Sequence, residues 1–184
     1  MIKRNAFQLR KGTDPTPEEI GAIKRYPIYI ILDNVLDTYN VGAIFRLADA
    51  VSAEKVILCG KTTTPPDHKI KKSSVDTWKW VQWEYAQTAM KAIASVKRLA
   101  SSVKIIAIEQ DERSVSFEKA DYSFPIALVV GHETDGVSQE VLDIADHIVE
   151  IPLFGVNRSL NVMVSLAIVL YEVVKKNNSL LTMG

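Results

Sequence analysis

The sequence predicts an α/β sandwich with a mostly parallel β-sheet. Short apolar runs, such as residues 28–32 and 126–130, have the composition of strands that are buried on both faces. These runs alternate with segments in which apolar residues recur at helical spacing. A chain of 184 residues with 47% hydrophobic residues fits a single globular domain.

The elements follow in a regular order along the chain. Thr16 and Glu19 form a capping-box pattern at the start of a short expected helix. Trp78, Trp80 and Trp83 belong to an expected extended segment, and residues 62–67 to a loop. We expect an N-terminal arm over residues 1–26 and a domain over 27–184. Strands are expected at 28–32, 55–58, 104–108, 126–130 and 147–151, and helices at 17–24, 40–50, 86–100, 138–144 and 159–175.

Composition disfavours a membrane protein and a disulfide scaffold. The apolar stretch 160–174 is shorter than the ~20 residues that a helix needs to span a bilayer. The N-terminus lacks the apolar core of a signal peptide. Cys59, the single cysteine, cannot form an internal disulfide and suits a reducing compartment. We therefore expect a cytoplasmic protein without a membrane partner.

The formal net charge is zero, yet charge is unevenly distributed. Residues 69–104 hold eight basic and two acidic side chains, a balance of +6. Residues 105–150 have a balance of −9, and residues 1–27 of +3. Such asymmetry can place a basic face on a neutral molecule and attract a polyanion. From charge alone, a solvated surface without a partner is the simpler interpretation.

Several familiar sites are missing from the sequence. It contains no G-x-G-x-x-G dinucleotide fingerprint, no Walker A loop and no G-x-S-x-G hydrolase elbow. His68, His132 and His147 have no partner at metal-ligand spacing, so we expect no metal site. In parallel sheets, ligands bind beyond the carboxyl ends of strands, which directs attention to the segments after the predicted strands.

Two of these segments carry unusual polar residues. After the first strand, Asn40 is placed to cap a helix, and Arg46 lies opposite the apolar stripe of that helix, as a surface arginine would. After the 126–130 strand comes G-H-E-T-D-G-V. Gly136 there can adopt a positive φ, and the segment is either a ligand loop or a tight turn in which Glu133 is ordinary surface charge.

The third segment, I-P-L-F-G-V-N-R-S-L-N-V, precedes the last helix. Ser159 or Asn157 is placed to cap this helix. Asn161 interrupts the start of a nearly all-apolar helix, where a buried amide needs hydrogen-bond partners. We therefore interpret Asn161 as a residue that fixes loop or ligand geometry.

Taken together, N-x-G-A-I-F-R, G-H-E-x-x-G-V and I-P-L-x-G…S-L-N-V resemble the three ordered motifs of the SpoU/TrmH-like branch of the SPOUT RNA methyltransferases. The resemblance covers residues 28–175, and the Pro65-Pro66 and Trp78–Trp83 segments are similar to one subgroup. It departs from the pattern at Arg158, where lysine is frequent, and at Met163 and Ser165, where smaller residues are usual.

The resemblance implies a single Rossmann-like parallel-sheet sandwich with a C-terminal deep trefoil knot, working as a homodimer. It implies methyl transfer from S-adenosylmethionine to a ribose 2′-hydroxyl of RNA, with tRNA favoured over rRNA. Arg46 matches the family's catalytic arginine, and the other polar positions of the active site are Asn40, Glu133, Ser159 and Asn161. The cofactor is expected against backbone near Ile108, Glu109, Gly131, Ile151, Ser159 and Leu160.

Two other interpretations remain open at this point. A catalytically inactive RNA-binding module could use the same fold and basic face, although Arg46, Glu133 and Asn161 are all present. A Rossmann-like small-molecule enzyme is the third option, which the missing glycine fingerprint disfavours.

Overall fold

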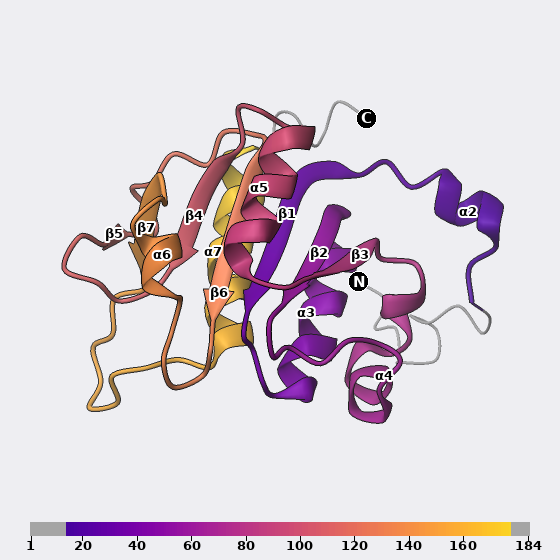
Figure 1. Cartoon of the computed structure of the whole chain (residues 1–184), viewed down its shortest axis with the longest axis horizontal. Coiled ribbons are helices and arrows are strands. Elements are labelled where there is room, and N and C mark those ends of the chain that lie inside the picture. Colours follow the sequence, from indigo (N-terminus) through magenta and orange to yellow (C-terminus); the bar gives the residue numbers. More distant parts are fainter. Residues whose placement is uncertain (1–13, 178–184) are drawn as a thin grey trace, which may run out of the picture.

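A computed structural model of the chain describes residues 14–177 and places seven parallel strands in one sheet (Figure 1). The predicted arm begins, and the predicted domain ends, outside the described residues. The strand order is β3-β2-β1-β6-β4-β7-β5. The strands span Tyr26–Asp33 (β1), Ala53–Cys59 (β2), Trp83–Ala86 (β3), Lys104–Ile108 (β4), Val115–Ser116 (β5), Ile126–Gly131 (β6) and His147–Glu150 (β7).

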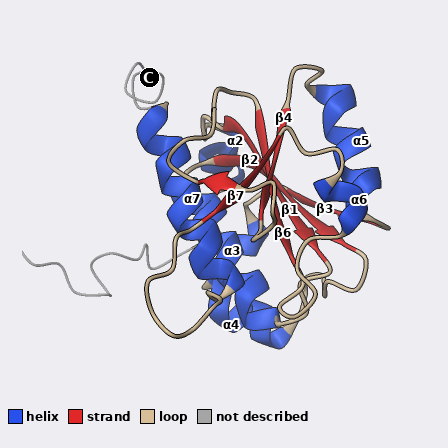
Figure 2. Cartoon of the chain, turned by 90° about the vertical axis from the view of Figure 1, so that its left-hand side faces the viewer, coloured by secondary structure: helices blue, strands red, loops and turns tan. Residues whose placement is uncertain are grey.

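Helices cover both faces of the sheet (Figure 2). One face carries α3, α4 and α7, and the opposite face carries α5 and α6. The predicted parallel α/β sandwich is thereby confirmed. The helices span Pro17–Gly21 (α2), Thr38–Ala50 (α3), His68–Ser74 (α4), Ala89–Leu99 (α5), Gln139–Leu142 (α6) and Val162–Lys176 (α7), with a 3-10 turn, η1, at Thr77–Lys79.

The two apolar cores explain why the central strands consist of unbroken apolar runs. In β1, Ile28, Ile30 and Leu32 face the core beneath α3 and α7, whereas Tyr29 and Ile31 face the core beneath α5. Successive residues of a strand point to opposite faces, so a strand that is covered on both sides needs apolar residues throughout. Burial of these runs supplies the main driving force for folding.

Residues 14–26 lie along the β3 side of the molecule, where Figure 1 shows α2. The predicted capping box is present, because the Thr16 hydroxyl accepts from the Glu19 backbone N–H and Glu19 accepts from the Thr16 N–H. Lys79 pairs with Asp14 at 2.6 Å, and the Arg25 guanidinium donates to the Trp80 carbonyl at 2.8 Å.

Several predicted boundaries are wrong. Trp78 lies in η1 rather than in an extended segment, and Ala86 ends β3 instead of starting α5. Two elements, α4 and β5, were not predicted from the sequence. The first is a seven-residue helix with few apolar positions, and the second is a two-residue strand held only by β7.

Cys59 ends β2 and is completely buried. Burial raises the pKa of its thiol to about 12, and the nearby carboxylates of Asp33 and Glu84 add to the effect. Within residues 14–177, no helix is both long and apolar enough to cross a bilayer.

Helices α3 and α4 approach closely at Gly42. A Cβ atom at this position would lie 2.7 Å from the Ile70 carbonyl oxygen and 2.9 Å from the Ser74 backbone nitrogen. Contacts this short force backbone to move, so the glycine sets the separation of the two helices.

We expect Gly42→Ala to lower the free energy of unfolding by about 1–3 kcal/mol through overpacking. Urea denaturation followed by circular dichroism measures this change. Ala43→Gly, one residue further along α3, is the control for backbone entropy and is expected to cost only about 1 kcal/mol. A Gly42→Ala protein as stable as the wild type would show that α4 is not tightly seated on α3.

Candidate active site at the carboxyl ends of the strands

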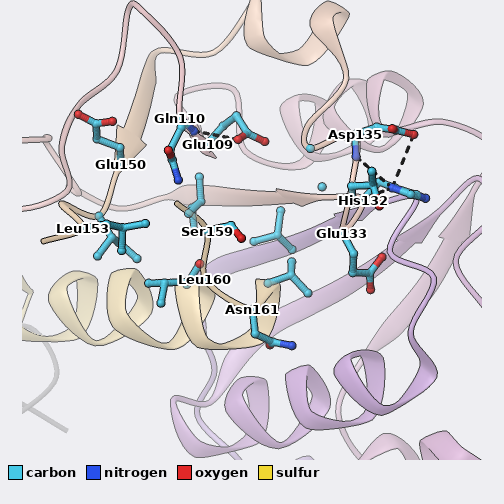
Figure 3. A pocket seen from close by; sticks show the side chains of 18 of the residues that line it. Glu109, Gln110, His132, Glu133, Asp135, Glu150, Leu153, Ser159, Leu160 and Asn161 are labelled. Atoms are coloured by element: carbon cyan, nitrogen blue, oxygen red, sulfur yellow. Dashed lines mark hydrogen bonds and ion pairs between the residues drawn. The ribbon is translucent and has the colours of Figure 1, made fainter. Parts of the chain in front are cut away.

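A cavity of about 490 Å³ lies beyond the carboxyl ends of β4, β6 and β7 (Figure 3). This volume is in the range of about 300–1,000 Å³ that small-molecule sites occupy. The described lining includes all six residues that the resemblance implied for the cofactor, and the catalytic candidates Glu133, Ser159 and Asn161: Ile108, Glu109, Gly131, Glu133, Ile151, Ser159, Leu160 and Asn161.

Glu133 connects the first two motifs through its carboxylate. Its Oε2 accepts from the Leu36 backbone N–H at 3.0 Å, and its Oε1 accepts from the Asp37 N–H at 2.9 Å. Oε1 also accepts from the Asn40 side-chain amide at 3.1 Å. Glu133 thus holds the turn that leads into α3, so it is not ordinary surface charge.

The same network continues into the third motif. The Asn161 side-chain amide donates to Asn40 Oδ1 at 3.0 Å. Asn161 Oδ1 accepts from the backbone N–H groups of Met163 and Val164 at 2.9 and 3.4 Å, and so caps α7. Three motifs that are far apart in the sequence are therefore joined by one line of hydrogen bonds, from Glu133 through Asn40 to Asn161.

This geometry corrects the predicted helix caps. Asp37, not Asn40, caps α3, and Asn40 is buried inside the network. Asn161, rather than Ser159 or Asn157, caps α7, so Asn161 precedes the apolar helix instead of interrupting it. Ser159 and Asn157 lie in the loop before the helix and line the cavity.

A second network joins the loops on the other side of the cavity. Glu109 Oε2 accepts from the Val137 N–H at 2.9 Å, and Oε1 accepts from the Gln110 N–H at 2.8 Å. The Gln110 side-chain amide donates to the Arg158 carbonyl at 2.7 Å. The carboxylate of Glu109 thus fixes loop backbone. Gln110 was not predicted as a site residue, although it closely follows the strand that is predicted at 104–108.

The turn after β6 has the conformation that its glycine allows. Gly136 has a φ of +71°, as the sequence predicts, and pairs with His132 through two backbone hydrogen bonds. His132 Nδ1 accepts from the Thr134 and Asp135 N–H groups at 3.0 and 3.2 Å. The imidazole of His132 therefore fixes the backbone of the turn, and its Nδ1 also lies 3.6 Å from the Asp135 carboxylate.

The charge of the lining is one-sided. Of the described residues around the cavity, four are carboxylates, and none is lysine or arginine. The carboxylates are Glu109, Glu133, Asp135 and Glu150, and the apolar part of the wall includes Val130, Leu153 and Leu160. A phosphate-bearing ligand would be repelled here, whereas a cationic or zwitterionic ligand with an apolar ring would fit.

Arg46 does not line the cavity of its own chain. It lies on the exposed side of α3, six residues beyond Asn40, and makes no hydrogen bond or ion pair with any residue between 14 and 177. The structure therefore brings Asn40, Glu133 and Asn161 together and leaves Arg46 apart. Within the described range 14–177, no group of three or more His, Cys, Asp or Glu side chains is placed so that it could hold a metal ion.

A doubly covered parallel sheet with a cavity at its carboxyl edge is typical of α/β enzymes that bind a small-molecule cofactor. The profile of the SpoU rRNA Methylase family matches residues 27–171, so the chain belongs to this family.

Individual relatives agree with this assignment. The chain is 33% identical over 155 residues to the tRNA (guanosine(18)-2′-O)-methyltransferase of Aquifex aeolicus, covering 84% of this chain and 72% of that protein. The enzyme of the same name from Thermus thermophilus is 32% identical, and the match covers 84% of this chain and 78% of that protein. The 23S rRNA (guanosine-2′-O-)-methyltransferase RlmB of Ralstonia nicotianae is 30% identical, and the match covers 97% of this chain and 69% of that protein.

Solved structures of the family have the same fold. The TrmH/SpoU tRNA-modifying enzyme of A. aeolicus superposes with a TM-score of 0.77 at 29% identity, over 87% of this chain and 80% of that chain. An AdoMet-bound rRNA methyltransferase from Sinorhizobium meliloti gives a TM-score of 0.75 at 30% identity, over 84% and 58%.

The Glu133 network predicts a pH dependence of stability. Burial acts to raise the pKa of this carboxyl, but the hydrogen bonds from Leu36, Asp37 and Asn40 outweigh it, and the pKa is lowered. A carboxyl with a lowered folded-state pKa stabilises the fold above its unfolded pKa of about 4.3, and this contribution is lost as the pH falls further.

We expect Glu133→Gln to lower the free energy of unfolding at pH 6 by about 1 kcal/mol, because an amide has one acceptor oxygen where the carboxylate has two. The difference from wild type should shrink by pH 3.5. Urea titrations at both pH values measure it, with exposed Glu140→Gln as the control. A difference independent of pH would contradict the assigned network.

Proposed function

We propose that this protein is an S-adenosylmethionine-dependent RNA methyltransferase that modifies a ribose 2′-hydroxyl, with tRNA favoured over rRNA as substrate. Family membership and the names of the relatives support the reaction class. The observation that carries the proposal is the joining of three family motifs at one cavity through Glu133, Asn40 and Asn161.

The cavity lining fits the cofactor. S-adenosylmethionine would supply a methyl group on a cationic sulfonium, and it also carries a flat aromatic adenine ring. The carboxylate-rich wall suits its positive charge, and Ile108, Ile151 and Leu160 give an apolar surface for the ring. The same lining argues against a pyrophosphate-bearing dinucleotide, and hence against a Rossmann-like oxidoreductase.

The residues of the chain would position the reactants rather than react covalently. In the transfer, the ribose oxygen would form its bond to the methyl carbon as the bond from that carbon to sulfur breaks; the electron pair would stay on the sulfur of a neutral thioether, and the hydroxyl proton would pass to solvent water. Holding two reactants in line accounts for a large part of such an acceleration. We assign Glu133, Asn40 and Asn161 to holding the loops, and Ser159, at the cavity, to orienting the substrate.

Arg46 is assigned to the RNA rather than to the cofactor. A guanidinium keeps its proton at ordinary pH, so it serves as a donor and a positive charge. Its exposed position on α3, outside the cavity, suits a contact with a phosphate beside the reacting ribose. From there it would stabilise negative charge that develops on the ribose oxygen.

We expect Arg46→Ala to lower methyl transfer to RNA by about 100-fold or more while S-adenosylmethionine binding stays unchanged. A tritium-methyl assay on bulk unmodified tRNA and on 23S rRNA, with calorimetry for the cofactor, measures both quantities. Arg98→Ala, an exposed arginine on the opposite face of the sheet, is the control. Undiminished turnover of Arg46→Ala would refute its role. A wild-type protein that binds cofactor and RNA without methylating either RNA would indicate an inactive RNA-binding module.

A homodimer is the proposed assembly, and the outer side of α7 supports it. While Leu166, Val169, Leu170 and Val173 pack inward, Val164 and Tyr171 are 37% and 52% exposed and share a stripe with Ile168. Phe154 and Val156, in the loop before α7, are each 97% exposed. A helix that is apolar on two sides needs a second partner.

We expect light scattering at micromolar concentration to give twice the 20.5 kDa mass of the chain. Val164→Glu combined with Tyr171→Glu should shift the protein to a monomer, because each places a charge in the apolar contact. Leu99→Glu, which changes an exposed leucine on α5, is the control. A monomeric wild type would refute the dimer.

After β7 the chain returns as α7 to the face of α3, and the end of α7 binds the segment between β5 and β6. There Lys176 donates to the Ala120 carbonyl at 2.9 Å, and Asn177 to the Tyr122 carbonyl at 2.9 Å. We propose that these crossings form the deep trefoil knot that the resemblance implies, in a domain from residue 27 onward preceded by an arm. A cytoplasmic location suits an RNA substrate and a free cysteine.

A further inference from the structure

Helix α4 presents an exposed cationic surface. His68, Lys69, Lys71 and Lys72 are exposed, whereas Ile70 and Ser74 are buried beneath them. Among residues 14–177, none of the three lysine ammonium groups has a hydrogen-bond acceptor or an ion-pair partner. The acidic groups that flank the helix are engaged elsewhere. Asp67 caps α4 by accepting from the Lys69 and Ile70 N–H groups, and Asp76 lies 3.4 Å from Lys79.

The charge pattern of α4 is only partly favourable for the stability of the helix. Lys71 and Lys72 lie in the last turn, where a cation is favoured by the helix dipole. Lys69 lies in the first turn, where a cation is disfavoured. Lys69 and Lys72 are also spaced three residues apart, so that their like charges repel each other across one turn. An anion bound over the lysines would relieve the unfavourable part of this pattern.

Helix α4 is held firmly in place. The close approach at Gly42 seats it on α3. Directly after its last residue, Val75 and Asp76 both have positive φ values, of 53° and 66°. A β-branched residue rarely adopts this conformation, and it persists only when the surrounding structure dictates it. Thr77 follows at once, and its hydroxyl donates to the Ser74 carbonyl at 2.9 Å.

The position of α4 relates it to the candidate active site. Figure 1 and Figure 2 show it beside α3, toward the end of the sheet at which β6 ends. Arg46 lies on α3 one helical turn after Gly42, the residue that contacts α4. Arg46 and the α4 lysines thus lie on two helices that pack together, and none of them lines the cavity, whose own lining carries four carboxylates.

We propose that Lys69, Lys71 and Lys72 bind the phosphate backbone of the substrate RNA next to the nucleotide that is methylated. This inference rests on the proposed function and deepens it. A cavity that repels phosphate cannot hold the RNA by itself, so the affinity must come from a cationic surface nearby. Helix α4 has three exposed lysines without partners among residues 14–177, and it is seated on the helix that carries Arg46, which favours it as that surface.

The test compares two variants of equal charge change. Lys69→Gln/Lys71→Gln/Lys72→Gln removes three positive charges from α4. Lys91→Gln/Lys97→Gln/Arg98→Gln removes three from exposed positions of α5, on the opposite face of the sheet. Lys69→Arg/Lys71→Arg/Lys72→Arg keeps the charge. Filter binding at several salt concentrations measures the affinity for bulk unmodified tRNA and 23S rRNA, and calorimetry measures S-adenosylmethionine binding.

We expect the α4 glutamine variant to lose about tenfold or more in RNA affinity at low salt, and the slope of log affinity against log salt to fall by about 2–3. The arginine variant and the α5 variant should stay close to wild type, and cofactor binding should be unchanged in all. Unchanged cofactor binding also shows that each variant is folded.

RNA binding and methylation by the wild type distinguish a failure of the α4 surface from a failure of the proposed function. If wild type methylates RNA and the α4 and α5 variants bind it equally well, the α4 surface is refuted while the function stands. Equal losses in both variants indicate diffuse charge attraction and also refute it. If wild type neither binds nor methylates either RNA, the proposed function fails, and the α4 lysines belong to a partner of another class, such as an acidic protein.

Discussion

The parallel pairing of β1 with β6 is the constraint on which the rest of this structure depends. It joins two segments almost a hundred residues apart in a register that sets Asp33 opposite Gly131. Both strands are apolar on both faces, and a slip by one residue would exchange the two cores. Because the strands end side by side, Asp33 accepts from the Ser138 N–H at 2.9 Å, and Glu133 reaches the turn before α3.

The same geometry separates two kinds of electrostatic surface. The strand ends gather carboxylates around a cavity, whereas α3 and α4 carry Arg46 and three exposed lysines outside it. The net charge of zero therefore arises because an acidic region and a basic region cancel, and it does not mean that the protein lacks charged binding surfaces. A cationic cofactor and a polyanionic substrate can each be attracted to a different part of one small domain.

The parallel sheet and the strand-end site follow from local sequence, because buried strands and amphipathic helices each have a periodic signature. The hydrogen-bond partners of polar side chains cannot be predicted from local sequence in this way. Asn40 and Asn161 resemble helix caps or isolated amides until a distant glutamate is placed beside them. Helix α4 has too few apolar positions for a periodic signal, and β5 exists only because β7 lies beside it. The exposed position of Arg46 on α3 was predictable; its separation from the cavity was not.

The burial of Cys59 has a practical consequence for spectroscopy. Thiol reagents attack the thiolate, and a thiol with no exposed surface and a pKa of about 12 offers almost none at neutral pH. Toward alkylating labels, the native protein therefore behaves as though it were free of cysteine. A single cysteine engineered at Ser101, exposed in the turn between α5 and β4, would carry a fluorophore or spin label as the sole reporter, with Cys59 left in the core.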